Sequence, residues 1–404
     1  MEKKKKPAIR FKGFTDSWEQ RKLGELGEIM TGSTPSTSKS EYYSEDGIPW
    51  VTPTDINSQT ISDTPRKLSG EGIKVGRVVP ANTILCTCIA SIGKNTLLTV
   101  KGSFNQQINC LTPNEYNDAY FLLTESEIWS NIMKRMAAAG TMQIVNKTEF
   151  SELTTMVPKL EEQKKIGQYF HTIGHLITLH QRKYDKLQII KKAMLEKMFP
   201  QNGSCFPEIR FKGFTDSWEQ RKFDKWGDFY YGHSCPKWSV TEDATIPCIR
   251  YGELYTKFGA KIDKVYSYTN MPTEKLRFGK GTEVLIPRVG EDPMDYNHCT
   301  WLSLKDVAIG EMISVFNTDQ DPLFSATMFN ATLQKEFAIR VEGGSVTNLY
   351  FDKLRNIDIS YPLLAEQKKI AAFFENLDHL ITLHQREVEK LQNIKKSMLE
   401  TMFV

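Results

Sequence analysis

The sequence predicts an α+β protein in which two mixed globular domains are separated by two long helices. The first supporting observation is a segment that occurs twice, since Ile9–Lys22 and Ile209–Lys222 are identical over all fourteen residues. The second is a longer repeat, in which 160–200 and 364–404 match at 26 of 41 positions. The third is the pair of blocks between the repeats, which differ in sequence but both mix strand-like and helix-like runs. We therefore predict a tandem duplication with pseudo-two-fold symmetry.

The long repeats carry the clearest secondary-structure signal. Pro158 precedes the first copy and marks the place where the chain enters a helix. Large side chains then recur at steps of four and three, which is the seam of a helix that pairs with another helix. The seam residues are Ile166, Phe170, Ile173, Ile177, His180, Tyr184, Leu187, Met194 and Met198 in the first copy, and Ile370, Phe374, Leu377, Ile381, His384, Val388, Leu391 and Met398 in the second. We predict an antiparallel coiled coil; the alternative is two separate helices that each cover their own domain. Gly174 and Asp378 are weak helix formers at which a break is conceivable.

The repeats set the predicted domain boundaries. These are 1–22 for the N-terminal repeat segment, 23–158 for the first variable domain, 159–200 for the central helix, 201–222 for a linker with the second repeat segment, 223–362 for the second variable domain and 363–404 for the C-terminal helix. Faint similarities connect the two variable domains: GIPWVTPTDI at 47–56 parallels TIPCIRYGEL at 245–254, and Gly140 and Gly344 precede the long repeats by the same distance. We therefore expect both domains to share one fold.

Composition excludes several classes of protein. The net charge of +3 is only mildly basic, so total charge alone does not argue for nucleic-acid binding. The seven cysteines are odd in number and scattered, which favours reduced thiols in a cytoplasmic protein over a disulfide framework. The basic N-terminal run has no apolar segment behind it, and no apolar stretch reaches membrane-spanning length.

No catalytic motif is apparent. The chain has no phosphate-binding loop of the Walker type, no His-Glu-x-x-His helix, no serine elbow and no Asn-Pro-Pro-aromatic tetrad of the kind that amino-methyltransferases use. A metal site that combines His233, Cys235, His298 and Cys299 would match no strong zinc spacing. Most histidines lie on the duplicated helices, where inheritance explains their pairing. The sequence therefore favours a binding protein without a cofactor or metal of its own.

Three groups of residues carry a family resemblance. They are the opening GFTDSWEQRKLGEL at 13–26 with its partial second copy, the stretch MTGSTPSTSKSEYYSEDGIPWVTPTDI at 30–56, and the helix entries VPKLEEQKKI and YPLLAEQKKI. With two variable blocks divided by near-duplicate helices, the whole chain resembles HsdS, the specificity subunit of type I restriction-modification systems. The second block departs from the first, because YYGHSCPKWSV at 230–240 replaces the Thr-Gly-Ser-Thr-Pro stretch.

The resemblance implies a division of labour. Each variable block would be a target recognition domain that reads one half of a split, asymmetric double-stranded DNA site. The helices would fix the spacing and dock two HsdM methyltransferase subunits, and HsdR motor-nuclease subunits would complete the complex. Adenine would be the methylated base, with S-adenosylmethionine bound by HsdM, ATP and Mg bound by HsdR, and no cofactor in this chain.

Base-reading side chains are expected to be polar or basic and to lie in loops of the variable blocks. The candidates are Ser33, Thr34, Ser36, Lys94, Asn95, Gln106, Gln107, Thr141 and Gln143 in the first block, and Lys237, Arg250, Tyr251, Arg288, Ser345, Thr347 and Asn348 in the second. Each could instead be a solvated or turn-capping residue. Arg250 is the sharpest candidate because Thr52 stands at the parallel position of the first block.

The identical segment IRFKGFTDSWEQRK is interpreted as an anchor. Its aromatic residues could stack on bases, but two blocks that read different sequences would not share their readers. Two other functions stay open at this point: a coiled-coil scaffold that presents two protein-binding domains, and, with less support, a self-sufficient modification enzyme.

Overall fold

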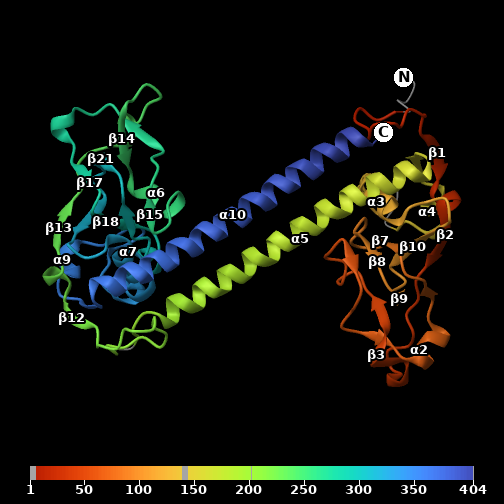
Figure 1. Cartoon of the computed structure of the whole chain (residues 1–404), viewed down its shortest axis with the longest axis horizontal. Coiled ribbons are helices and arrows are strands. Elements are labelled where there is room, and N and C mark those ends of the chain that lie inside the picture. The colour runs from red at the N-terminus through yellow and green to blue at the C-terminus, as the bar shows by residue number, and fades with distance from the viewer. Residues whose placement is uncertain (1–5, 139–143, 202, 404) are drawn as a thin grey trace. The chain divides into compact units, whose positions relative to one another are not determined.

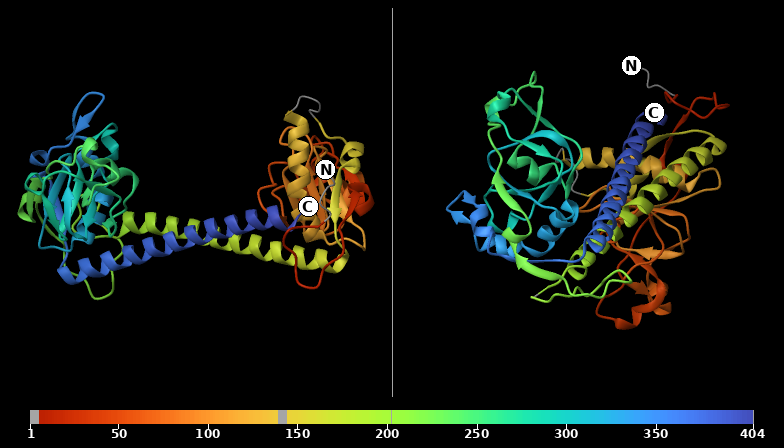
Figure 2. Two further views of the ribbon diagram at one scale, coloured as in Figure 1. Left: turned by 90° about the horizontal axis from the view of Figure 1, so that it is seen from above. Right: turned by 60° about the vertical axis from the view of Figure 1, so that its left-hand side comes forward.

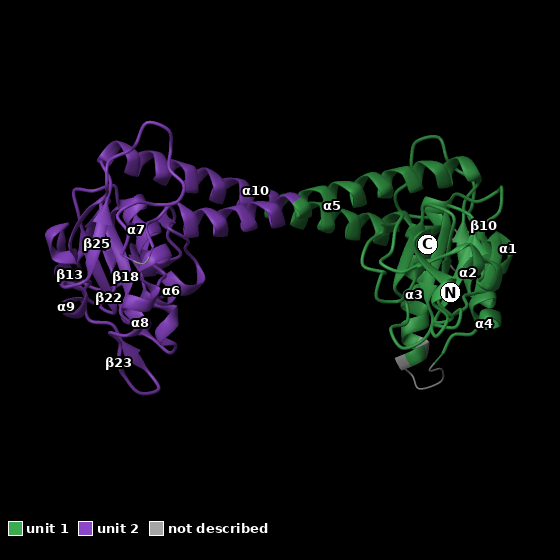
Figure 3. Cartoon of the chain, turned by 90° about the horizontal axis from the view of Figure 1, so that it is seen from below, with its two compact units in different colours: residues 1–182, 385–404 green, residues 183–384 purple. Residues whose placement is uncertain are grey.

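The computed structural model describes residues 6–138, 144–201 and 203–403 (Figure 1). The chain divides into two compact units, of which unit 1 comprises residues 1–182 and 385–404, and unit 2 comprises residues 183–384 (Figure 3). Both boundaries fall inside long helices, α5 (Leu160–Lys197) and α10 (Leu364–Met402). Each unit therefore contains one globular head and half of each long helix. We call residues 23–158 head 1 and residues 223–362 head 2.

Head 1 is built on two packed sheets. The five-stranded sheet has the order β2 (Gly27–Thr31), β10 (Ile108–Pro113), β7 (Thr83–Thr87), β8 (Asn95–Leu98) and β4 (Thr60–Ile61). The four-stranded sheet has the order β5 (Lys67–Leu68), β3 (Tyr43–Val51), β9 (Gly102–Phe104) and β6 (Val78–Val79). Two pairings are parallel, β4 with β8 and β3 with β9, and the others are antiparallel.

Head 2 repeats this topology strand for strand. Its five-stranded sheet has the order β13 (Asp228–Tyr231), β22 (Ile313–Asn317), β18 (Glu283–Pro287), β20 (Thr300–Leu302) and β15 (Lys261–Ile262). Its four-stranded sheet has the order β16 (Ser267–Thr269), β14 (Ile246–Ile249), β21 (Lys305–Ile309) and β17 (Phe278–Lys280). The parallel pairs recur as well, β15 with β20 and β14 with β21. The shared fold expected of the two variable blocks is therefore present.

Smaller elements complete the heads. Head 1 has the helices α1 (Leu23–Leu26), α2 (Gly70–Val75), α3 (Ala119–Ala138) and α4 (Lys147–Glu152), and the 3₁₀ turn η1 (Ser40–Tyr42). Head 2 has the helices α6 (Tyr251–Thr256), α7 (Pro322–Thr332), α8 (Gln334–Ala338) and α9 (Phe351–Leu354), the 3₁₀ turns η2 (Phe223–Lys225), η3 (Lys237–Ser239), η4 (Thr273–Lys275) and η5 (Pro293–Asp295), and a small sheet of β19 (Val289–Gly290), β24 (Thr347–Asn348) and β23 (Glu342–Gly343).

Alternating side chains of the central strands fill two cores in each head. In β7, Ile84 and Cys86 pack toward α3, whereas Leu85 between them packs toward the four-stranded sheet. In β18, Val284 and Leu285 divide in the same way between the α7 side and the four-stranded sheet. Because both faces of these strands are covered, every residue of β7 and β18 is buried.

Within each unit the two helix halves lie side by side, as both views of Figure 2 show. In unit 2, Phe199 stacks on Phe374 with ring centroids 5.8 Å apart, and Lys191 forms an ion pair with Asp378. Phe199 comes after Lys191 in the chain, whereas its partner Phe374 comes before Asp378, so the two helices are antiparallel. In unit 1, Phe170 contacts Phe403 in the equivalent arrangement. The predicted α+β class with paired long helices is confirmed.

The long helices run without the break that seemed conceivable. In unit 1, Gly174 leaves room for the side chain of Gln59, whose Oε1 atom lies where a β-carbon of residue 174 would stand. In unit 2 the equivalent residue Asp378 is used instead in the ion pair with Lys191. Tertiary contacts thus outweigh the weak helix propensity of both residues.

The repeated segment attaches each head to the helices. The strand β1 (Glu19–Lys22) pairs with β11 (Thr154–Val157), and β12 (Glu219–Lys222) pairs with β25 (Asp358–Tyr361) in the same register. Near the beginning of the same segment, Arg10 makes a two-pronged ion pair with Glu162 on α5, at 2.8 and 2.6 Å. Arg210 does the same with Glu366 on α10, at 2.8 and 2.7 Å. The segment therefore acts as the anchor that its duplication suggested, and we call it, together with α5 and α10, the frame.

Candidate nucleic-acid interface

Three turns meet at one place in head 1. They comprise residues 32–36 after β2, 52–55 after β3 and 104–107 at the end of β9. The N–H of Ser33 donates to the carbonyl of Phe104, and the N–H of Asn105 donates to the carbonyl of Val51, both at 2.9 Å. The Asn105 side chain also donates from Nδ2 to Thr34 Oγ1 at 3.2 Å. These bonds hold the three turns together, so their polar side chains gather in one area.

The equivalent three segments meet in head 2, where they comprise residues 232–236 after β13, 250–253 at the start of α6 and 309–312 at the end of β21. The N–H of His233 donates to the carbonyl of Ile309 at 2.8 Å, and the N–H of Gly310 donates to the carbonyl of Ile249 at 2.9 Å. A third bond joins the N–H of Glu311 to the carbonyl of Ser234 at 3.1 Å. The backbone of this turn cluster is thus common to both heads, while the side chains on it differ.

Thr52 and Arg250 occupy the same backbone position. Thr52 follows Val51, which pairs in parallel with the last residue of β9. Arg250 follows Ile249, which pairs in parallel with the last residue of β21. The N–H of Thr52 donates to the carboxylate of Asp55, and the N–H of Arg250 donates to the carboxylate of Glu253, both at 2.8 Å. The equivalence inferred from the sequence is therefore present in the structure, and the half-buried Arg250 replaces a hydroxyl side chain in the turn cluster.

Five of the head 1 candidates lie in the turn cluster. They are Ser33, Thr34, Ser36, Gln106 and Gln107. Ser36 and Gln106 are exposed, whereas the Ser33 hydroxyl accepts a hydrogen bond from the N–H of Arg77 at 2.9 Å. The structure therefore brings together residues that are about 70 positions apart in the sequence.

Lys94 and Asn95 lie elsewhere, beside α3. The Asn95 side chain donates to the carbonyl of Ser126 at 2.9 Å and to the Ser130 hydroxyl at 2.6 Å, and it thereby fastens β8 to the helix. Lys94 is exposed next to it. The remaining head 1 candidates, Thr141 and Gln143, fall outside the described residues.

The head 2 candidates divide into three groups. Lys237, Arg250 and Tyr251 lie in or beside the turn cluster, and Lys237 and Tyr251 are exposed. Arg288 adjoins the cluster, because its Nη1 donates to the carbonyl of Glu311 at 3.3 Å. The last group is on the β23–β24 hairpin, where Ser345 is exposed at the tip, Asn348 is half-buried and Thr347 is buried.

Thr347 has a packing role. Its hydroxyl donates to the carbonyl of Gly290 at 3.0 Å, and its own carbonyl accepts from the Tyr296 hydroxyl at 2.6 Å. These bonds join the hairpin to β19 and to the core. Thr347 therefore holds the hairpin in place.

Sequence reasoning missed an arginine that supports the cluster in both heads. Nη1 of Arg77 donates to the carbonyl of Thr31 at the end of β2, and Nη1 of Arg277 donates to the carbonyl of Tyr231 at the end of β13. Both arginines follow their acceptors by the same number of residues. The equal spacing between each arginine and its acceptor was the only sequence signal that could have revealed this pair, because the residues around the two arginines differ.

Aromatic rings flank the cluster in head 2. The guanidinium of Arg277 lies 5.0 Å from the Tyr230 ring centroid, and that of Arg288 lies 4.7 Å from the Tyr231 ring centroid. Burial raises the pKa of the Tyr231 phenol, while the Arg288 charge acts in the opposite direction. The ring is thus neutral at ordinary pH and presents its face to the cation.

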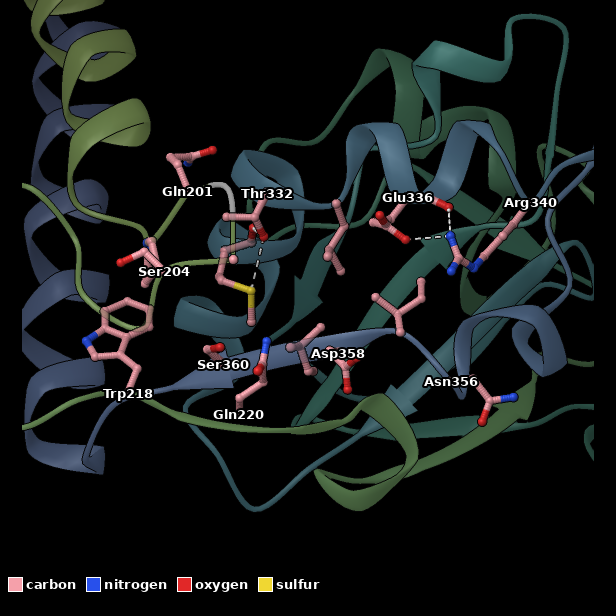
Figure 4. A pocket seen from close by; sticks show the side chains of 16 residues that line it. Gln201, Ser204, Trp218, Gln220, Thr332, Glu336, Arg340, Asn356, Asp358 and Ser360 are labelled. Atoms are coloured by element: carbon pink, nitrogen blue, oxygen red, sulfur yellow. Dashed lines mark hydrogen bonds and ion pairs between the residues drawn. The ribbon is translucent and has the colours of Figure 1, made fainter.

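Two of the pockets lie at the frame, away from the turn clusters. One of about 390 Å³ in unit 2 is lined by residues that include Trp218, Gln220 and Asp358 (Figure 4). A second, of about 410 Å³ in unit 1, is lined by the equivalent strands β1 and β11. Figure 4 shows the Glu336–Arg340 pair at the edge of the first pocket. Neither pocket gathers a set of reactive side chains.

Among the residues that the structure describes, no group of three or more His, Cys, Asp or Glu side chains could hold a metal ion. Within the same residues, no helix is long and apolar enough to cross a membrane. Cys86, Cys88, Cys110, Cys235, Cys248 and Cys299 are buried as free thiols.

Comparison with known proteins decides the family. The protein-family model described as "Type I restriction modification DNA specificity domain" matches residues 15–188 and 306–393, which is more than half of the chain. The chain belongs to this family. It is therefore the non-catalytic specificity subunit of a type I restriction-modification system, and its function is DNA sequence recognition.

Individual relatives agree with this assignment. The specificity subunit of the MjaIX enzyme of Methanocaldococcus jannaschii is 23% identical over 95% of this chain and 91% of its own length. The HindI specificity subunit of Haemophilus influenzae is 31% identical over 38% of this chain and 35% of its own length. The crystal structure of an S subunit from M. genitalium superposes with a TM-score of 0.64 at 12% identity and covers 99% of both chains, which shows a common fold. The resemblance to specificity subunits drawn from the sequence is confirmed.

Proposed function

We propose that each head of this specificity subunit reads one half of a bipartite, asymmetric site on double-stranded DNA. The observation that carries the proposal is the contrast between backbone and side chains in the turn clusters. Equivalent hydrogen bonds fix the same three turns in both heads, yet Thr52 becomes Arg250 and Ser33 becomes His233. A constant scaffold with changed polar side chains is what two readers of different base sequences require.

The frame would set the length of the unread gap between the two half-sites. Half-sites read from the same side of B-DNA are about 34 Å apart per helical turn. The 38-residue α5 has a length of roughly 57 Å, which is sufficient for that role. Because the frame contacts are duplicated, exchange of a head would alter the bases read without altering the gap.

The long helices would also dock two methyltransferase subunits. The segment HLITLHQR is identical at 175–182 and 379–386. Within it, Leu179 and Leu383 are 38% and 44% exposed, so both copies present an apolar side chain to solvent. Two identical surfaces on two helices fit two copies of one partner. Motor-nuclease subunits would join this assembly.

The chemistry would reside in those partners. The methyltransferase subunits would bind S-adenosylmethionine and methylate adenine, and the motor-nuclease subunits would bind ATP and Mg. This chain would contribute base contacts, spacing and docking, and it would bind none of these cofactors.

Exchange of a head tests the proposal. The chain is co-expressed with its methyltransferase subunit, and methylated motifs in the host genome are sequenced for the wild type and for a variant whose residues 223–362 come from a relative. We expect the methylated motif to keep one half and its gap and to change in the other half. Arg250→Ala should weaken methylation through the head 2 half-site alone.

Two results would contradict the proposal. One is an unchanged methylated motif after the head is exchanged. The other is DNA binding by the complex with little affinity and little dependence on salt, which a protein scaffold would show.

A further inference from the structure

The residue that follows the central strand of the five-stranded sheet has the same backbone contacts in both heads. In head 1 it is Cys88, whose N–H donates to the carbonyl of Gln107 at 2.9 Å and whose carbonyl accepts from the N–H of Val145 at 3.0 Å. In head 2 it is Arg288, whose N–H donates to the carbonyl of Met312 at 3.2 Å and whose carbonyl accepts from the N–H of Leu349 at 2.8 Å. The backbone is constant here, whereas a buried thiol is replaced by a guanidinium.

Two tyrosine rings and one carbonyl hold the Arg288 side chain. Its guanidinium carbon lies 4.7 Å from the centroid of Tyr231 and 5.3 Å from the centroid of Tyr350. Nη1 donates to the carbonyl of Glu311 at 3.3 Å. We call Arg288 with these two rings the arginine clamp. A guanidinium held in this way loses less side-chain entropy when it binds a ligand.

The outer edge of the guanidinium is available. Among the described residues, Nη2 has no hydrogen-bond partner and is not among the atoms shielded from solvent, whereas Nε is shielded and unpartnered. No carboxylate of the described chain forms an ion pair with Arg288. The charge is therefore uncompensated on the side next to the turn cluster.

Head 1 lacks all three parts of the clamp. The β2 residue equivalent to Tyr231 is Thr31, since each accepts a hydrogen bond from the supporting arginine. The residue equivalent to Tyr350 is Asn146, since each precedes the first turn of a short helix, α4 or α9. With Cys88 in place of Arg288, three positions on three separate elements differ together. Because the backbone is equivalent at all three positions, packing alone does not require these three side chains to differ together.

We propose that the arginine clamp reads a guanine in the half-site of head 2; the inference rests on the proposed function of that head. An arginine fork that donates two hydrogen bonds matches O6 and N7 of guanine in the major groove, and no other base offers two acceptors there. The Nη1 and Nη2 edge supplies both donors. Head 1 has no side chain at this position that could make the contact.

Base-by-base substitution tests the proposal. The complex with the methyltransferase subunit is assayed for binding and methylation on duplexes in which each base pair of the head 2 half-site is changed in turn. The wild type should require guanine at one position. Arg288→Cys, which introduces the head 1 residue and removes the guanidinium donors, should reduce discrimination at that position by about 5- to 150-fold, whereas Arg288→Lys, whose ammonium can still donate to guanine, should retain part of it. Discrimination at every other position should be unchanged.

Variants of the clamp separate this reading role from a folding role. Tyr231→Phe keeps the ring and should retain discrimination, whereas Tyr231→Thr, which introduces the head 1 residue, should lower it at the same base pair. Readout of the head 1 half-site serves as the internal control, because it reports an assembled complex in every variant.

The alternative is a phosphate contact. In that case Arg288→Cys would keep the wild-type discrimination while weakening binding equally on every duplex and lowering the salt slope by about 1. That result overturns the guanine assignment and leaves the proposed function intact. A wild-type complex with no preference at any half-site position would overturn the proposed function itself, and the guanine assignment with it.

Discussion

At the scale of single residues, duplication separates side chains that hold the protein together from those that can vary. Arg10 and Arg210 are identical in sequence, in partner type and in geometry. Gln163 and Gln367 are a second such pair: each side chain donates to a proline carbonyl at 2.9 Å and accepts the N–H of an aspartate that caps a head helix. These residues explain why Glu-Gln recurs at the start of both long helices.

The Arg210–Glu366 pair gives the first prediction at this scale. The Glu366 side chain is 1% exposed, and the hydrogen bond from Arg210 is the main reason that the pKa of Arg210 is raised. Arg210→Ala would leave a buried carboxylate without its partner, which should lower the free energy of unfolding of unit 2 by about 3–5 kcal/mol. Urea denaturation measures the change.

A matched control comes from an exposed pair in the same unit. The side chains of Lys353 and Glu342 are 50% and 55% exposed, so Lys353→Ala should cost only about 0–1 kcal/mol. Similar losses for both variants would show that burial does not decide the strength of the Arg210 contact.

Glu125 gives a prediction for pH. This carboxyl group on α3 is 2% exposed, its Oε1 accepts from the Thr155 hydroxyl, and burial raises its pKa to about 8. A raised folded-state pKa means that the folded chain binds the proton more tightly than the unfolded chain. Its contribution to stability is therefore complete below about pH 4.5 and is lost as pH rises to about 8.

Glu125→Gln tests this dependence because the amide keeps an acceptor for Thr155 but does not titrate. Between pH 5 and 8, the wild type should lose stability in unit 1 with a slope of up to about 1.4 kcal/mol per pH unit relative to the variant. Hydrogen exchange of unit 1 peptides, compared between the two proteins at each pH, measures the difference. Unit 2 has Met328 at the equivalent position of α7 and should be unaffected. Parallel pH profiles for the two proteins would refute the assignment.

At the scale of elements, the end of each long helix completes the core of a head. Phe403, directly after α10, packs on Trp18, Phe121 and Phe170 with centroid distances of 5.6–5.9 Å. Phe199 after α5 makes the equivalent contacts with Trp218, Phe324 and Phe374. Each head thus depends on the helix that belongs to the opposite repeat.

Truncation of these phenylalanines should be costly for stability. Phe403→Ala should destabilise unit 1, and Phe199→Ala unit 2, by about 3–5 kcal/mol, because each removes a buried ring from an aromatic cluster. Thermal unfolding followed by hydrogen exchange assigns the loss to one unit. Leu383→Ala, at an exposed helix position, is the control and should leave stability within about 0.5 kcal/mol. A loss spread over both units, or a Phe403→Ala loss as small as the control, would contradict this account.

The elements also show how far sequence reasoning reached. The long helices were predictable because a seam of large side chains repeats over many turns. Strand order was not, since the parallel pairing of β3 with β9 joins residues about fifty positions apart and β4 has only two residues. Residue type alone makes Asn95 and Thr347 candidate base readers, but their side chains bind a neighbouring helix and strand, a common use of short polar side chains. The clamp tyrosines were missed because they meet Arg288 only in the folded head.

At the scale of the whole molecule, the charge pattern explains why composition was a weak guide. The net charge of +3 hides a local group of arginines at the turn cluster of head 2, namely Arg250, Arg277 and Arg288. Many other charges are used within the frame and on the helix surfaces as local ion pairs. Local placement, rather than the total, is what bears on binding to a polyanion.

The identical anchor has a genetic consequence. A crossover between the DNA segments that encode Ile9–Lys22 and Ile209–Lys222 would join two coding regions inside a stretch where every amino acid is the same. The chimera would regain the Arg–Glu bridge, the buried tryptophan and the first paired strand at the junction, whichever partner it received. New combinations of recognition modules could therefore arise in one step and fold at once, without a run of compensating mutations.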